Sequence, residues 1–217
     1  MTKRRLERDL ETLSDEVLAE LDPGERNQYI FIAQAQDNDY WIERLHDTCP
    51  ADQLGETIAL GQLSLQFAFE TVYDLHTIAL QLELFETRNW ARIFAEGDDR
   101  PSEAALERAS DRADDTQAQF VALYLAYHGN RRFAKDVLGI EFETWLAPHK
   151  HGSMVIDLAE DTLADSSRRR LAEEWVLEEM ELFADEPDDD PLDALVDNWA
   201  EHRIAAFQRL SAGIYSG

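Results

Sequence analysis

The chain has 217 residues, with 46 acidic side chains against 20 basic ones, so its formal net charge is −26 at neutral pH. Only three of the basic residues are lysines, and a hydrophobic content of 44% with five tryptophans excludes a disordered acidic tail. The self-repulsion of such a surface is screened at molar salt, where the Debye length is about 3 Å. The composition is therefore typical of a folded cytosolic protein of a halophile, in particular of haloarchaeal proteins.

Cysteine usage and hydropathy narrow the setting further. Cys49 is the only cysteine, which excludes an intramolecular disulfide and a cysteine-based metal site. The first residues are charged and lack an apolar leader, and no run of about 18 apolar residues follows. We therefore expect a cytoplasmic protein that neither carries a signal peptide nor contacts a membrane.

Apolar residues recur at three- and four-residue intervals along almost the whole chain, which predicts an all-α fold. A first helical stretch ends at Asp22-Pro23-Gly24, and a second helix runs from about Glu25 to Cys49-Pro50. Residues 56–96 carry apolar side chains on more than one face, which is typical of a central helix. One helix of that length would span about 60 Å, so we expect it to kink or break. Ser102 is then expected to cap a helix that ends at Gly129.

In the rest of the chain, the spacing of apolar residues predicts short helices over 154–163 and 168–183. An acidic, proline-flanked linker at 185–191 separates them from a last amphipathic helix. The predicted architecture is a multi-helix bundle over 1–184, with a long central helix and a helix-turn-helix at 120–147, followed by the linker and a C-terminal helix and tail at 192–217. That last helix is free to pack on the bundle, to bind a protein partner, or to pair with a second copy of the chain.

Residues 120–152 contain the motif with the highest local specificity. A small residue, Ala134, lets two helices cross closely, and Gly139 can adopt the positive φ of a tight turn. The apolar Ile140 then fills the space beneath the turn. The pattern resembles the helix-turn-helix unit of the Fis class of bacterial DNA-binding regulators, G-N-x-x-x-A-A-x-x-L-G-I-x-x-x-T-L. The matching positions are Gly129, Asn130, Ala134, Leu138, Gly139, Ile140 and Thr144.

The resemblance implies a DNA-associated regulator in which a helix beginning near Glu141 enters the major groove. Lys135 replaces the second alanine of the pattern, Trp145 replaces its leucine, and Pro148 shortens the recognition helix. Carboxylates at the start of that helix repel phosphates, so they are a poor opening for base contacts. The side chains expected to contact DNA are Arg131, Arg132, Lys135, Phe142, Glu143, Thr144 and Lys150.

Three basic patches interrupt the acidic sequence. Residues 128–152 carry four Arg or Lys against three acids, and the other two patches are Lys3-Arg4-Arg5 with Arg8, and Arg168-Arg169-Arg170. Phosphate contact is one reason for such patches. Pairing with the chain's own carboxylates is the other, and the sequence leaves both open.

Two further functions compete with DNA binding. Glu43 and His46 have the spacing of a metal-binding Glu-x-x-His motif, with Glu70 and Asp74 as carboxylates on another helix, but a di-iron bundle needs that motif twice. The sequence also lacks a phosphate-binding loop, a nucleophile elbow and a zinc-protease motif. We therefore expect no enzyme activity and no cofactor, and the principal alternative to DNA binding is a non-catalytic helical interaction module.

Overall fold

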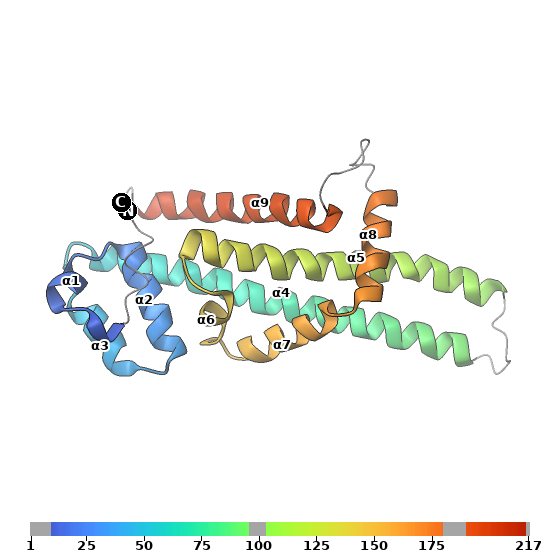
Figure 1. Cartoon of the computed structure of the whole chain (residues 1–217), viewed down its shortest axis with the longest axis horizontal. Coiled ribbons are helices and arrows are strands. Elements are labelled where there is room, and N and C mark those ends of the chain that lie inside the picture. The colour runs from blue at the N-terminus through green and yellow to red at the C-terminus, as the bar shows by residue number, and fades with distance from the viewer. Residues whose placement is uncertain (1–9, 96–102, 180–189, 216–217) are drawn as a thin grey trace. The chain divides into compact units, whose positions relative to one another are not determined.

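A computed structural model describes residues 10–95, 103–179 and 190–215 (Figure 1). Helices and turns account for this part of the chain and none of it forms a strand, which confirms the all-α prediction. The elements in chain order are η2 (Leu10–Thr12), α1 (Asp15–Ala19), α2 (Pro23–Ala35), α3 (Asp39–Asp47), α4 (Leu54–Ala95), α5 (Glu103–Phe133), the π-helical turn η3 (Ala134–Leu138), α6 (Phe142–Leu146), α7 (Gly152–Leu163), α8 (Ser166–Glu179) and α9 (Pro191–Ile214).

The chain divides into two compact units that share its long helices. The first unit comprises Met1–Glu70, Arg131–Gly152 and Arg203–Gly217, and the second comprises Thr71–Asn130 and Ser153–His202. Helices α4, α5 and α9 each contribute one portion to either unit. This grouping differs from the expected single bundle over 1–184 with a separate last helix.

The N-terminal core of the first unit is built from η2 and α1 to α3. Asp22 caps α2, because its side chain accepts from the Glu25 N–H at 2.8 Å while Glu25 accepts from the Asp22 N–H. Pro23 occupies the first turn, so Asp22-Pro23-Gly24 starts a helix as well as ending the preceding segment. The core side chains are Leu10, Leu13, Leu18, Leu21, Tyr29, Ile30, Ala33, Trp41 and Leu45.

The helix expected from Glu25 to Cys49 is two helices, α2 and α3. Asp37 takes a left-handed conformation with φ of 52°, and Asn38 then caps α3 through its side-chain oxygen. Asp and Asn adopt that backbone conformation more readily than other non-glycine residues. The prediction was wrong here because the cap at Asn38 was overlooked.

A buried arginine joins the three N-terminal helices. The Arg26 guanidinium donates to the Leu45 carbonyl at 2.6 Å and to the Leu18 carbonyl at 2.6 Å, near the C-terminal ends of α3 and α1. Those ends carry partial negative charge from their unpaired carbonyls. Burial lowers the pKa of Arg26 from its ordinary value, and helix-end carbonyls accept its hydrogen bonds.

An aromatic cluster forms the other half of the first unit's core. Phe67 of α4 stacks on Phe133 at 5.4 Å between ring centroids, and Phe207 of α9 meets both rings edge-on. Trp145 of α6 is fully buried, and its indole N–H donates to the Ser64 carbonyl at 3.3 Å. This cluster fixes α6 and the end of α9 in the unit.

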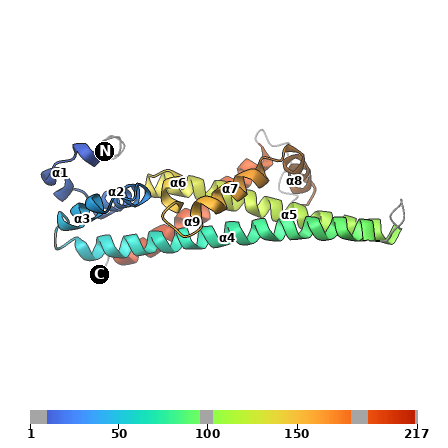
Figure 2. The same cartoon turned by 90° about the horizontal axis from the view of Figure 1, so that it is seen from below.

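In the second unit α4 and α5 run side by side, as both views show (Figures 1 and 2). Tyr127 of α5 donates to Glu160 of α7 at 2.5 Å, and Tyr124 donates to Asp193 of α9 at 3.0 Å. Burial, with the hydrogen bond to Asp193, raises the pKa of Tyr124 to about 12. The Tyr124 phenol therefore remains a protonated donor over the physiological pH range.

Two long helices continue where the sequence predicted a break or a stop. Helix α4 runs for 42 residues without the expected break. Helix α5 passes through Gly129 and Asn130 to Phe133, so Gly129 is not a helix stop. Asn130 is buried and donates to the Ala126 carbonyl one turn back at 2.8 Å, which keeps its side chain within the helix. The glycine is required for packing, because a Cβ at Gly129 would lie 2.2 Å from the ring of Trp199 on α9.

Candidate functional site

The turn of the expected helix-turn-helix lies at Gly139. Its φ is 67°, the left-handed conformation that a glycine adopts without strain, as the sequence predicted. The Ile140 N–H donates back to the Ala134 carbonyl at 3.2 Å, and both Ala134 and Ile140 are buried. The small residue and the apolar plug therefore have the packing roles expected of them, although the helix before them continues through Gly129.

The segment in the position of a recognition helix is α6, which has five residues. Phe142 is 1% exposed and packs near Trp145, with ring centroids 6.4 Å apart. The expectation that Phe142 contacts DNA is therefore wrong, because its side chain belongs to the core. At this end of α6 the exposed side chains are Glu141 and Glu143, whereas Thr144 is half-buried. This small exposed surface is acidic.

The basic side chains of the motif divide into paired and solvent-facing ones. Arg131, Lys135 and Lys150 are exposed, whereas Arg132 forms an ion pair with Asp136 at 3.3 Å, one turn along the helix. Surface pairs of this kind contribute little to stability. Three bases of the motif thus point to solvent beside an acidic α6.

The patch Arg168–Arg170 pairs with carboxylates of its own unit. Each of its three guanidinium groups lies within ion-pair distance of an acid, and Arg169 bridges Glu173 at 2.8 Å and Asp190 at 2.5 Å. The alternative left open by the sequence is the one observed here. The third patch, Lys3 to Arg8, lies outside the described residues.

The candidate metal ligands do not converge. Within the described ranges, no group of three or more His, Cys, Asp or Glu side chains is placed to hold an ion. Glu70 instead accepts from Arg203 at 3.1 Å, and Glu43 and His46 are exposed. Burial lowers the pKa of His149, whose Nε2 atom is buried without a hydrogen-bond partner among the described residues.

The surface feature that sequence reasoning missed is an apolar face on α4. In the first unit Leu54, Ile58, Leu65 and Phe69 are 38%, 46%, 38% and 68% exposed. At 100° per residue these four positions fall within an arc of about 60°. The multi-sided apolar pattern of 56–96 contained this signal, but we took it to indicate a helix covered on all sides. We call these four residues the α4 apolar face.

Further along α4, in the second unit, Tyr73 and Leu80 are also exposed, at 62% and 39%. The long helix α4 is therefore covered on one side and exposed on the other. The buried side chains on the opposite side of α4, in the first unit, are Leu60, Ser64 and Phe67.

The C-terminal helix is packed rather than free. In the second unit α9 buries Leu192, Val196 and Ala200. In the first unit it buries Phe207, and Arg203 donates to the Phe67 carbonyl at 3.1 Å. Most of the apolar residues that suggested a docking helix are thus used within the chain, although Leu210 is 53% exposed.

Among the described residues, no helix combines the length and apolar character needed to cross a bilayer. Comparison with known proteins finds no family model, no curated protein and no solved structure that matches this chain.

Proposed function

We propose that this protein is a non-catalytic helical interaction module that pairs with a second copy of itself through the α4 apolar face. The observation that carries the proposal is an exposed, uncharged face on a chain whose formal charge is −26. Exposed apolar surface is unfavourable in water unless it is covered. Its concentration on one face of one helix distinguishes it from the single apolar residues scattered over any protein surface.

The extent of the face supports this reading. Phe69 alone exposes 68% of its surface, or roughly 140 Å² for an aromatic side chain of about 200 Å². With the three aliphatic side chains, the patch reaches the few hundred Å² at which exposed apolar surface marks interaction sites. Between Leu54 and Phe69 no other residue falls within this arc, and the residues on its two borders are Gly61 and Gln62, so the face has no ionisable side chain.

Charge favours a second copy as the occupant. A basic partner would be drawn to the acidic surface elsewhere, whereas an uncharged face offers it no attraction. In a two-fold symmetric pair the same patch covers itself, and the acidic surfaces can remain in solvent. Molar salt screens the repulsion between two such chains and does not weaken apolar contacts. The pair should therefore tighten as salt rises.

The experiment is sedimentation velocity over a range of protein and KCl concentrations, with wild type, Phe69→Asp and Tyr40→Asp. Tyr40, on α3 in the same unit, is 65% exposed and serves as the matched control, because it loses a comparable aromatic surface and gains the same charge. We expect wild type and Tyr40→Asp to dimerise in molar KCl and Phe69→Asp to stay monomeric with an unchanged circular dichroism spectrum. A monomeric wild type at all salt concentrations, or a dimer unaffected by Phe69→Asp, would overturn the proposal.

DNA association is the second candidate, and a specific observation favours it. The left-handed Gly139 with buried Ala134 and Ile140 fits the turn of a Fis-like unit, and Arg131 and Lys135 are exposed next to it. The short α6 with its exposed Glu141 counts against it. Fluorescence anisotropy with genomic fragments tests this candidate. Binding should weaken steeply with salt and should fall in an Arg131→Ala, Lys135→Ala double variant.

A further inference from the structure

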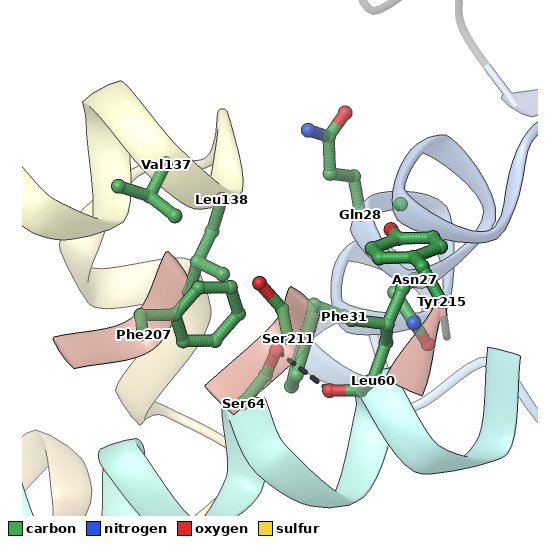
Figure 3. A pocket seen from close by; sticks show the side chains of 11 residues that line it. Asn27, Gln28, Phe31, Leu60, Ser64, Val137, Leu138, Phe207, Ser211 and Tyr215 are labelled. Carbon is green, nitrogen blue, oxygen red and sulfur yellow. Dashed lines mark hydrogen bonds between the residues drawn. The ribbon is translucent and has the colours of Figure 1, made fainter. Parts of the chain in front are cut away.

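We infer that a cavity in the first unit binds a small uncharged molecule with an apolar body and at least one hydrogen-bond donor. The cavity has a volume of about 120 Å³ and lies among α2, α4, η3 and the end of α9 (Figure 3). The cavity is separate from the α4 apolar face, because none of the four residues of that face lines it.

One wall of the cavity is apolar. Phe31, Leu60, Leu138 and Phe207 line it, and each is between 3% and 7% exposed. Figure 3 shows the Leu138 and Phe207 side chains next to each other on one side, with Phe31 on another. Apolar cavities of about 150 Å³ in proteins accept a benzene ring. The space here therefore suits a body of about one six-membered ring.

Three side chains of the polar wall present acceptors to the cavity, because each of them uses a donor within the protein. The Ser64 hydroxyl donates to the Leu60 carbonyl at 2.9 Å, and the Asn27 amide donates to the Thr57 carbonyl at 3.1 Å. Ser211 at the end of α9 likewise donates to a carbonyl of its own helix at 3.1 Å. Oxygen atoms of these side chains retain lone pairs, so a molecule in the cavity gains hydrogen bonds by donating them.

Gln28 supplies the most specific acceptor. It lines the cavity, and its Oε1 atom is buried and accepts no hydrogen bond from the described residues. A buried acceptor without a donor destabilises the folded state. Because this oxygen has almost no accessible surface, the Gln28 amide must turn toward the cavity to accept from a ligand hydroxyl or amide N–H. That hydrogen bond removes the cost of the unpaired acceptor, which links binding to the donor and not only to the apolar body.

Two carboxylates close to the cavity mouth, outside its lining, disfavour the binding of anions. None of the lining residues carries a formal charge, and Tyr215 at the mouth is 59% exposed. Burial raises the pKa of the Tyr215 phenol, and the negative charges of Glu56 and Asp22 raise it further. These two carboxylates lie close enough to affect that phenol, so a ligand carboxylate or phosphate would be repelled as well.

The probes for the test are phenol, toluene and benzoate, which share one ring and differ in donor and charge. Binding is measured by ligand-observed NMR and by the thermal shift of the full chain in molar KCl. We expect phenol to bind and raise the midpoint of unfolding, toluene to bind more weakly, and benzoate not to bind. A wild type that binds none of the probes, or that binds benzoate as well as phenol, overturns the inference.

The Gln28→Leu variant tests whether the ligand is bound through a hydrogen bond to this side chain or only through apolar contacts. The change keeps the approximate volume and removes the unpaired acceptor, so it should leave stability unchanged or higher. Phenol affinity should fall about tenfold, the net worth of one hydrogen bond, while toluene affinity is retained. Gln208→Leu makes the same change at an exposed position of α9 outside the cavity and should alter neither affinity. An equal loss of affinity for phenol and for toluene in Gln28→Leu would overturn the role of its oxygen.

The Phe69→Asp variant should bind phenol like wild type, because Phe69 does not line the cavity. A failure of self-pairing and a failure of the cavity site are therefore distinguishable.

Discussion

Replacing Gly129 by alanine tests whether this glycine serves packing or a turn. A Cβ atom there would lie 2.2 Å from Trp199 Cε3 and 2.7 Å from Cζ3. Carbon atoms in contact are normally about 3.5–4.0 Å apart, so the indole would have to move by at least about 1.3 Å. Alanine gains about 0.5–1 kcal/mol over glycine within a helix, whereas overpacking a core costs about 1–3 kcal/mol or more. We expect the clash to dominate, with a net loss of about 1–2 kcal/mol.

The assay is denaturant and thermal unfolding in molar KCl, followed by tryptophan fluorescence and circular dichroism. For a chain of this size each kcal/mol corresponds to a fall of about 2–4 °C in the midpoint. Gly55→Ala and Gly213→Ala are matched controls, because a Cβ at either position meets no atom within 4 Å. These variants should be as stable as wild type or slightly more stable.

A second substitution separates the two roles of Gly129. Trp199→Leu removes the ring that the new methyl group would strike, so the double variant should lose less than the sum of the two single losses. A turn glycine with positive φ would not be rescued in this way, because its strain lies in the backbone. Gly129→Ala with wild-type stability, or a double variant with strictly additive losses, would refute the packing argument.

Three further predictions concern residues of the first unit. Phe142→Ala should cost about 3–5 kcal/mol, as expected for a buried aromatic side chain, while Glu143→Ala on the exposed side of α6 should stay within about 0.5 kcal/mol; denaturant unfolding compares them. Arg26→Met should cost about 2–5 kcal/mol in the same assay, because two helix-end carbonyls lose charged donors. Burial lowers the folded-state pKa of His149 below that of the unfolded chain. The unfolded state therefore takes up a proton first, and stability falls as the pH drops below about 6.5. His149→Gln should reduce that slope, and an unchanged slope would contradict this assignment.

Local patterns predicted most of the helices, because helical periodicity and caps are properties of neighbouring residues. Helices α4 and α7 both begin and end within two residues of their predicted bounds. The conformation of Gly139 also followed from local chemistry. Gly129 misled the prediction since a glycine inside a helix and a glycine after its end look alike in sequence. Only the position of Trp199, 70 residues away, distinguishes the two.

The candidate site was less predictable, because exposure depends on neighbours that are distant in sequence. Phe142 was assigned to a DNA-reading surface by its place in the motif, yet the short α6 turns it into the core beside Trp145. The α4 apolar face was missed for the opposite reason. An apolar pattern on several sides indicates either a covered central helix or an exposed binding face, and periodicity alone cannot distinguish them.

Salt separates the two candidate functions in one titration. In the described part of the chain, many arginines form ion pairs with the chain's own carboxylates, as Arg169 does with Glu173 and Asp190. Few exposed basic side chains are therefore available to contact DNA phosphates. Binding that depends on Arg131, Lys135 and Lys150 releases counterions and must weaken as KCl rises. Pairing through Phe69 and its aliphatic neighbours is opposed by the charge of −26 and must strengthen as that charge is screened. The sign of the salt dependence, measured on the same preparation, therefore decides which of these surfaces is the functional one.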